Sequence, residues 1–432
     1  MLGGGIFTVQ NKLLPGAYIN FVSAAGSASA LSDRGIVAVP LTMDWGPEKT
    51  VVEMTAEEFS RDTRRALGYT HDAEALRDLR EVFCHATKCL IYRLNAGAKA
   101  QNDLAEAKYS GTRGNAIKIV VAANADNEDK FDVSTLLDNR EVDKQTVAGI
   151  GALTDNDYVT WKKEGTLEAT AGKPLSGGTN GEEVDGEDHS AFLDAMETCT
   201  FNVLCCPVKD DSTKALYVAF TKRLRDEAGI KFQTVLYRKN DADYEGVISV
   251  ENKATEQEQG LVYWTAGAEA ACAINKTNDN MVYDGEYTVD AAFTQQQLAD
   301  AIAAGKFVFH RVSGQTRVLL DINTLTTYTE EKKEDFANNQ TVRVLDQIGN
   351  DIAVMFNTQF FGKMPNDASG RISLWNSITT YMKQLAEIRA IEAVDAETVT
   401  VNPGENKRAV VVELPVTPIN CMAQLYMTVV VA

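Results

Sequence analysis

The first 32 residues place two strand-forming runs in front of a tether of small residues, and this order constrains the rest of the chain. Residues 5–9 and 17–22 are rich in β-branched and aromatic side chains, and Leu14-Pro15-Gly16 marks a turn before the second run. Residues 24–32 are mainly Ala, Gly and Ser, the composition of a flexible linker. A strand-forming arm on such a flexible tether has nothing local to pair with.

Beyond this N-terminal arm and linker (1–32), the residue pattern predicts four domains. Residues 33–90 are mixed α+β, and residues 91–182 show short strands separated by Gly, Asn and Asp turns, as in a β-sandwich or β-barrel. In residues 183–326, helices and strands alternate, which predicts a doubly wound parallel sheet. Residues 327–432 are predicted to form an α+β C-terminal domain.

The C-terminal domain is predicted to contain two long helices, at residues 330–356 and 369–393, followed by strands at 398–401, 409–415 and 425–431. The second helix carries apolar residues at intervals of three and four, which indicates one buried stripe. The residues of this stripe are Ile372, Trp375, Ile378, Met382, Leu385, Ile388 and Ile391.

Charge and composition exclude several classes of partner. The formal net charge of −19 argues against a surface that wraps nucleic acid, which needs clustered Lys and Arg. No apolar run reaches the ~20 residues of a membrane span, and the best candidate, residues 261–274, contains Glu269. The first five residues lack the basic and apolar parts of a signal peptide, so we expect no export by the general pathway. The seven cysteines are expected to be reduced thiols.

No catalytic or metal-binding motif stands out, so neither a cofactor nor a metal is expected. The Gly-Lys pairs at Gly172, Gly305 and Gly362 are never followed by Ser or Thr, which excludes a phosphate-binding loop of the nucleotide type. Cys84 and Cys89 have no second ligand pair at zinc-site spacing. The acidic residues 182–188 lack the ligand spacing of a calcium loop and are expected to be solvated.

Four histidines could in principle serve a nucleophilic site. We expect His71 and His189 to be solvated and His85 and His310 to be packed, because no local signature pairs any of them with a catalytic serine. A hydrolase on the α/β domain is nevertheless kept as an alternative, as is a secreted surface or adhesin-type protein.

Several segments, in order along the chain, resemble the contractile phage tail sheath family, in particular sheaths of phages and R-type bacteriocins of Gram-positive bacteria. The resemblance rests on Leu14-Pro15-Gly16-Ala17-Tyr18-Ile19, on Arg34 to Leu41 with Asp44-Trp45-Gly46-Pro47, on Tyr109-Ser110-Gly111-Thr112-Arg113-Gly114-Asn115, on Leu175 to Gly181, and on Asp321 to Thr326 followed by Arg343, Asp346 and Ile348.

The resemblance implies a structural protein, not an enzyme. It implies a subtilisin-like but non-catalytic α/β domain, with extended arms at both ends of the chain. Members of this family form contractile injection systems, in which subunits polymerise as stacked six-fold rings around a tail tube. The expected partners are other copies of the chain, the tube protein, and baseplate and tail terminator proteins, with no nucleic acid and no membrane insertion. The particle would assemble in the bacterial cytoplasm and become part of a virion tail or tail-like particle.

The resemblance also implies that neighbouring subunits exchange β-strands. The donor residues would be Ile6, Phe7 and Val9 in the N-terminal arm and Leu425, Tyr426, Val429 and Val430 in the C-terminal arm. The acceptor residues would be Val399, Val401, Val410, Val412 and Leu414. Each backbone hydrogen bond contributes only ~0.5–1.5 kcal/mol, so such arms must also bury apolar side chains, at ~1.5–3 kcal/mol each. The alternative is that both ends pair within their own domain.

Basic residues near the second long helix suggest a contact with the tube. Lys363, Arg371 and Lys383 are locally concentrated in an acidic chain and could face an acidic tube surface. The alternative is a packed helix whose charged side chains are simply solvated.

Overall fold

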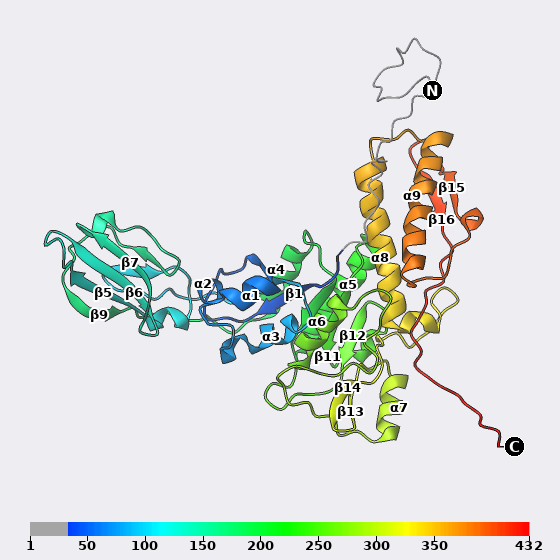
Figure 1. Ribbon diagram of the computed structural model, residues 1–432, viewed down its shortest axis with the longest axis horizontal. Helices are drawn as coiled ribbons and strands as arrows, with labels where there is room; N and C mark the ends of the chain where they lie inside the picture. The colour runs from blue at the N-terminus through cyan, green and yellow to red at the C-terminus, as the bar shows by residue number, and fades with distance from the viewer. Residues whose placement is uncertain (1–32, 432) are drawn as a thin grey trace, which may run out of the picture.

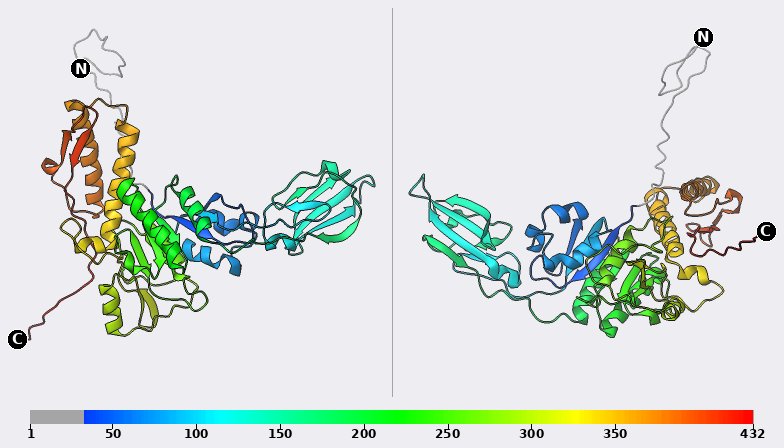
Figure 2. Two further views of the ribbon diagram at one scale, coloured as in Figure 1. Left: turned by 180° about the vertical axis from the view of Figure 1, so that it is seen from behind. Right: turned by 60° about the horizontal axis from the view of Figure 1, so that its bottom comes forward.

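The computed structural model describes residues 33–431 and arranges them in three lobes (Figure 1). A β-rich lobe lies at one end, an α/β body occupies the middle, and a pair of long helices with a small hairpin projects from the body. The other two views show that the β-rich lobe stands apart from the helical pair (Figure 2). The predicted strands within residues 1–32 lie outside the described residues.

The body contains one six-stranded sheet with the strand order β12-β11-β10-β1-β3-β2. Its strands are β1 (Ile36–Leu41), β2 (Val51–Thr55), β3 (Lys88–Arg93), β10 (Val203–Cys206), β11 (Gln233–Tyr237) and β12 (Val247–Val250). All pair in parallel except β2, which lies antiparallel to β3 at one edge. The predicted parallel sheet is therefore present.

Strand β1 joins two stretches of chain that the sequence assigns to different domains. Val37 of β1 lies opposite Val203 of β10 on one side and opposite Cys89 of β3 on the other. Residues 33–90 and 183–326 thus contribute to one sheet, and the β-rich lobe is an insertion between them.

Helices cover both faces of this sheet. They are α3 (Arg77–Phe83) and α6 (Leu261–Ala271) on one face, and α4 (Gly186–Met196) and α5 (Asp211–Lys222) on the other. Val37 and Val39 pack in the same core cluster as Trp264 of α6, whereas Ala38 packs in the cluster of Tyr217 of α5. Because successive side chains of a strand point to opposite faces, a strand covered on both faces must be apolar throughout.

The β-rich lobe is built on a four-stranded antiparallel sheet with the order β7-β6-β5-β9. Its strands are β5 (Ile117–Ala123), β6 (Phe131–Leu137), β7 (Arg140–Val147) and β9 (Thr170–Pro174), accompanied by the pair β4 (Ala105–Ala107) and β8 (Val159–Trp161). Asp138 and Asn139 turn β6 into β7 with positive φ angles, which suits residues tolerant of the left-handed region. Trp45, from the segment before the insertion, belongs to the core of this lobe.

The C-terminal domain consists of α8 (Asn339–Met355), α9 (Ala368–Glu387), β15 (Thr400–Pro403) and β16 (Val410–Glu413). Helix α8 begins nine residues later than predicted, because Asn338 caps it by accepting hydrogen bonds from the Gln340 and Thr341 amides. Helix α9 ends at Glu387 and is followed by Arg389 at φ +61°. The third predicted strand, 425–431, pairs with no segment of residues 33–431.

The remaining elements are short. They are α1 (Ala56–Arg61), α2 (Arg64–Leu67), α7 (Gln295–Ala303) and the hairpin β13 (Phe309–Val312) and β14 (Gln315–Val318). Among the described residues, no helix combines the length and the apolar character that crossing a membrane requires.

Candidate assembly surfaces

The β15–β16 hairpin has two open edges. The two strands pair antiparallel, and no third strand joins them within residues 33–431. Just beyond the strands, the Gly404 N–H donates to the Ala409 carbonyl oxygen at 2.8 Å. Hydrogen-bonded and non-hydrogen-bonded pairs alternate along an antiparallel ladder, so Val401 and Val412 form a non-hydrogen-bonded pair.

In such a pair, the backbone N–H and C=O groups point away from the partner strand. The same alternation applies to Val410, so Val410 and Val412 present backbone groups along the free edge of β16, and Val401 does so along the free edge of β15. Within the described residues, the amides of these three valines donate no hydrogen bond. Unpaired edges of this kind are templates for a further strand, and a two-stranded sheet is only marginally stable alone.

The five predicted acceptor residues lie in this hairpin or directly beside it. Val399 is buried, and its carbonyl oxygen already accepts a hydrogen bond from Trp375 Nε1 at 3.0 Å. Val401, Val410 and Leu414 are half-buried against the helices, whereas Val412 is exposed. The hairpin is as predicted, and the acceptor role of these residues stays a prediction.

The C-terminal arm leaves the C-terminal domain at Cys421. Its root is fixed, because the Cys421 N–H donates to Gln340 Oε1 at 3.0 Å and Gln340 Nε2 donates to the Ile419 carbonyl. Beyond this point the apolar side chains are almost fully exposed, with Leu425 at 84% and Val430 at 85%. The remaining exposed apolar residues of the arm are Met422, Tyr426, Met427, Val429 and Val431.

The N-terminal donor residues Ile6, Phe7 and Val9 lie outside the described residues, but the root of their arm is visible. Arg34 Nε donates to the Cys272 carbonyl at 3.2 Å, and Arg34 Nη2 donates to the Glu269 carbonyl at 3.3 Å. The chain therefore enters β1 attached to the end of α6.

The same helix end carries the main junction between the body and the C-terminal domain. Arg343 of α8 donates through Nη2 to Glu269 Oε2 at 2.7 Å and to Asp321 Oδ2 at 2.9 Å, and all three side chains are fully buried. Burial and the neighbouring Asp321 carboxylate raise the pKa of Glu269. A second buried pair, Arg225 with Asp346, lies one turn further along α8.

The free end of the C-terminal domain carries two of the three basic residues predicted to touch a tube. Lys363 lies in the connection between α8 and α9, where its Nζ donates to the Thr358 carbonyl. Arg371 lies in the first turn of α9 and donates to Asn366 Oδ1 at 3.0 Å. Lys383 is exposed twelve residues further along α9, which places it ~18 Å from Arg371 along the axis. The structure thus groups two of the three candidates and separates the third.

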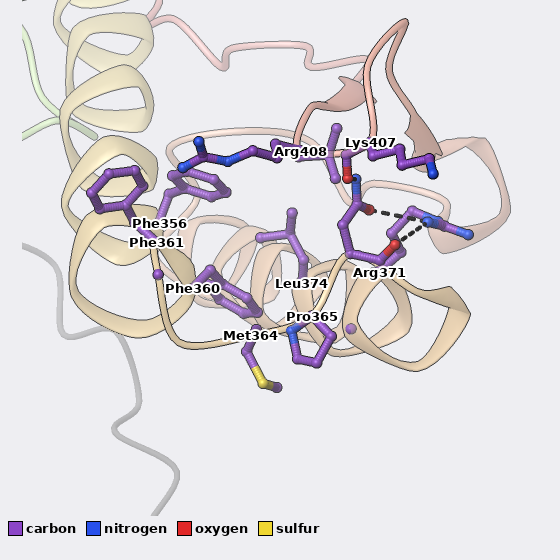
Figure 3. Close-up of a pocket in the computed structure, with 13 residues that line it drawn as sticks. Phe356, Phe360, Phe361, Met364, Pro365, Arg371, Leu374, Lys407 and Arg408 are labelled. Carbon is purple, nitrogen blue, oxygen red and sulfur yellow. Dashed lines mark hydrogen bonds between the residues drawn. The ribbon is translucent and has the colours of Figure 1, made fainter.

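Two further basic residues were missed from the sequence. Lys407 and Arg408 occupy the turn between β15 and β16, and together with Arg371 they line a pocket of about 230 Å³. The pocket has apolar walls, to which Phe360, Met364 and Leu374 contribute (Figure 3). The sequence gives one hint of these residues, a Lys-Arg pair directly after the turn-forming run Gly404-Glu405-Asn406. Only the fold brings this turn next to the start of α9.

The histidines form no catalytic arrangement in the described part of the chain. His189 is buried, against our expectation, and its Nδ1 lies 2.7 Å from the Tyr217 hydroxyl. His85 Nε2 lies 3.0 Å from Asp284 Oδ1, and no serine hydroxyl is hydrogen-bonded to either ring. No group of three His, Cys, Asp or Glu side chains within residues 33–431 is arranged to hold a metal ion. In the acidic segment, Asp185 is the N-cap of α4 rather than merely solvated.

These features define a multidomain α/β protein with an exposed apolar arm and an open-edged hairpin. Four family models match successive parts of it. They are described as the tail sheath protein Gp18 domain III N-terminal region (residues 34–94), the phage tail sheath protein beta-sandwich domain (95–180), the phage tail sheath protein central domain (182–324) and the phage tail sheath C-terminal domain (331–432).

Similar proteins lead to the same family. The phage-like element PBSX protein XkdK of Bacillus subtilis is 34% identical over 99% of both chains. The crystal structure of the sheath tail protein from Desulfitobacterium hafniense superposes with a TM-score of 0.83 at 38% identity, covering 94% of this chain and 98% of that one. A contracted sheath of an extracellular contractile injection system, at 10% identity, shares the fold with a TM-score of 0.54, covering 97% of this chain and 98% of that one. The protein therefore belongs to the phage tail sheath family and is a structural sheath subunit.

Proposed function

We propose that the protein polymerises as stacked six-fold rings around a tail tube, and that donated β-strands link neighbouring subunits. The observation that supports this proposal best is the match between a donor and an acceptor within one chain. Residues 422–431 are extended and exposed and share no backbone hydrogen bond with the described residues, while Val401, Val410 and Val412 direct unpaired backbone groups outward. Within residues 33–431, the arm lacks a partner strand, and the hairpin lacks a further strand along its free edges.

The energetics favour pairing between copies over leaving both surfaces in water. A strand of five residues gains several backbone hydrogen bonds at ~0.5–1.5 kcal/mol each. Burial of Leu425, Tyr426 and Val429 adds ~1.5–3 kcal/mol for each large side chain. Part of this gain offsets the entropy of ordering the arm. Arms of this kind hold neighbours together while the bodies of the subunits shift, which is what contraction of a sheath requires.

Truncation of each arm tests the proposal. A chain ending at Cys421 keeps the hydrogen bonds that Asn420 and Cys421 form with α8 at the root of the arm. We expect this variant, and a variant lacking residues 1–21, to fold with an unchanged melting temperature but to form no cylinders in electron micrographs. The full chain is the control and should form hollow, ridged cylinders. Normal cylinders from either truncated variant would contradict strand donation by that arm.

A contact with the tube is the second part of the proposal. Lys363 and Arg371 lie at the free end of the C-terminal domain, and Lys383 is exposed on α9, so all three can reach a separate partner. Replacement of all three by Glu should abolish assembly on tubes that carry an acidic surface while leaving the subunit folded. Unchanged assembly on such tubes would dismiss the contact. Baseplate and terminator proteins are further expected partners of the polymer ends.

A further inference from the structure

The free end of the C-terminal domain presents apolar side chains to solvent. Apart from the C-terminal arm, the most exposed large apolar residues within residues 33–431 are Phe361 at 64%, Val354 at 60% and Ile372 at 60%. All three lie where α8 ends and α9 begins, beside the pocket lined by Arg371, Lys407 and Arg408. We call this region, residues 354–374 with 407–410, the tip. Exposed apolar surface of this kind marks a site for a protein partner.

The pocket in the tip has the size and lining of a site for one side chain. Its volume of about 230 Å³ lies below the ~300–1,000 Å³ of small-molecule sites. Figure 3 shows Arg408 reaching from the hairpin turn toward the rings of Phe356 and Phe361, while Lys407 and Arg371 point to the other side. The ligand that fits best is an apolar or aromatic side chain with carboxylates beside it.

Neither arm of the chain carries an Asp or Glu side chain. Residues 422–431 carry no charged side chain, and residues 1–32 carry only Lys12, which has the same sign as the rim. Lys407 and Arg408 also form no ion pair within the described residues, and Asp367 is engaged as the N-cap of α9. The cationic rim therefore calls for another acidic segment.

A segment with the required chemistry lies at the opposite end of α8. Tyr328 is 49% exposed and is followed by Glu330 and Glu331, neither of which has an ion-pair partner in residues 33–431. The nearby Lys332 is neutralised by Glu245, at 2.6 Å, which leaves Lys333 as the one opposing cation next to the two glutamates. We call residues 326–335 the acidic loop.

Hydrogen bonds hold the acidic loop in a fixed shape. Asp243 Oδ1 accepts hydrogen bonds from the amides of Thr326 and Thr327, at 2.7 and 3.0 Å. The Thr329 N–H donates to the Lys332 carbonyl at 2.9 Å, which closes a turn around the glutamates. A preorganised loop of this kind loses little entropy when it binds.

The two surfaces cannot meet within one chain. Helix α8 has 17 residues and therefore separates the acidic loop from the tip by about 25 Å. Figure 1 shows this helix running from the body to the free end of the domain.

We propose that the tip pocket of one subunit receives Tyr328 of a neighbouring subunit, with Glu330 and Glu331 of that neighbour facing Lys407 and Arg408. The contact joins two different surfaces, so it is a head-to-tail contact that generates rings or helical filaments rather than closed dimers. It rests on the proposed function, because the neighbour is the next subunit of the same polymer. It adds to strand donation a side-chain contact that fixes the register of neighbouring subunits.

Charge exchange tests this contact with the full chain and without tubes. We expect Lys407→Glu/Arg408→Glu and Glu330→Lys/Glu331→Lys each to weaken polymerisation by about tenfold or more, measured as the critical concentration in sedimentation. The variant with all four changes should polymerise close to the unmodified level, because the opposite charges face each other again. Lys130→Glu/Arg140→Glu, two exposed cations of the β-rich lobe, is the matched control and should have no effect.

Three outcomes would overturn the contact while leaving strand donation intact, provided that the arm truncations still abolish cylinders. Both reversals could leave polymerisation unchanged. The reversal at the tip alone could weaken it, which would assign the pocket to a different partner. Finally, the fourfold variant could fail to recover although its melting temperature matches that of the unmodified chain. Loss of polymerisation on replacing Tyr328 by Ala, but not by Phe, would support the pocket as the site of the aromatic ring.

Discussion

Arg343 of α8 lies 2.7 Å from Glu269 of α6, and both side chains are fully buried although they belong to different domains. Asn278 Nδ2 donates to the other oxygen of Glu269, and Asn339 Nδ2 donates to Asp321, the second acid that contacts Arg343. The segment that directly follows the N-terminal arm is attached to the same helix end through Arg34. The cluster therefore joins the body, the C-terminal domain and the root of one arm.

Removal of Arg343 should destabilise the protein strongly. In Arg343→Met, the buried side chains of Glu269 and Asp321 lose their cationic partner, which typically costs about 3–5 kcal/mol. Denaturant unfolding of the monomeric, arm-truncated chain measures this loss. Arg61→Met is a suitable control, since Arg61 forms only an exposed pair with Glu57. Similar stability for the two variants would show that the buried cluster does not hold the domains together.

The start of α8 depends on a single side chain. Asn338 accepts hydrogen bonds from two amides of the first turn, at 2.9 and 3.3 Å. Asn338→Ala should lower the free energy of unfolding by about 0.5–2 kcal/mol, and Asn338→Ser should recover most of it. Equal stability of all three chains would mean that packing alone fixes this helix end.

The open edge of β16 can be blocked without changing the body. Because the Val412 N–H points outward, Val412→Pro removes a donor that an added strand needs but the hairpin does not use. Val412→Thr keeps the N–H and serves as the control. We expect the proline variant to stay monomeric and the threonine variant to polymerise. Polymerisation of both would place the incoming strand elsewhere.

The acidic loop should loosen at low pH. Burial raises the pKa of Asp243, but the hydrogen bonds from the Thr326 and Thr327 groups outweigh it and lower the pKa from 3.8 to about 2. A lowered pKa means that the carboxylate stabilises the fold above about pH 4 and loses this effect as the pH falls through 2. Titration of Asp243 by NMR, with the exchange protection of the Thr326 amide, measures both quantities. A pKa near 4 would contradict these hydrogen bonds, and Asp243→Asn should abolish the pH dependence.

The sequence predicted the elements better than their assembly. Strand 36–41 is recognisable from its apolar run, but nothing local shows that it inserts between β3 and β10, because that pairing spans more than 160 residues. The helix predicted to begin at residue 330 begins at Asn339, because the side chain of Asn338 caps it there. Long-range pairing and side-chain caps are decided by tertiary contacts that periodicity does not contain.

One residue of the predicted apolar stripe lies in a different environment from the one expected. Ile372 fits the apolar stripe of α9 but is 60% exposed, at the tip rather than in the core. The stripe is buried from Ile378 to Leu385, where α8 and the hairpin cover it, and Ile372 is exposed where the domain ends. Lys407 and Arg408 were missed for a related reason. Whether a hairpin turn lines a pocket depends on the elements that pack beside it, and the local sequence does not show these.

The most direct test of the account is a high-resolution electron cryomicroscopy structure of the polymer formed by the full chain. We expect residues 425–431 of one subunit and residues 5–9 of another to lie as added strands on the β15–β16 hairpin of a third. A map in which both ends of the chain return to the hairpin of their own subunit, with no exchange between copies, would contradict it.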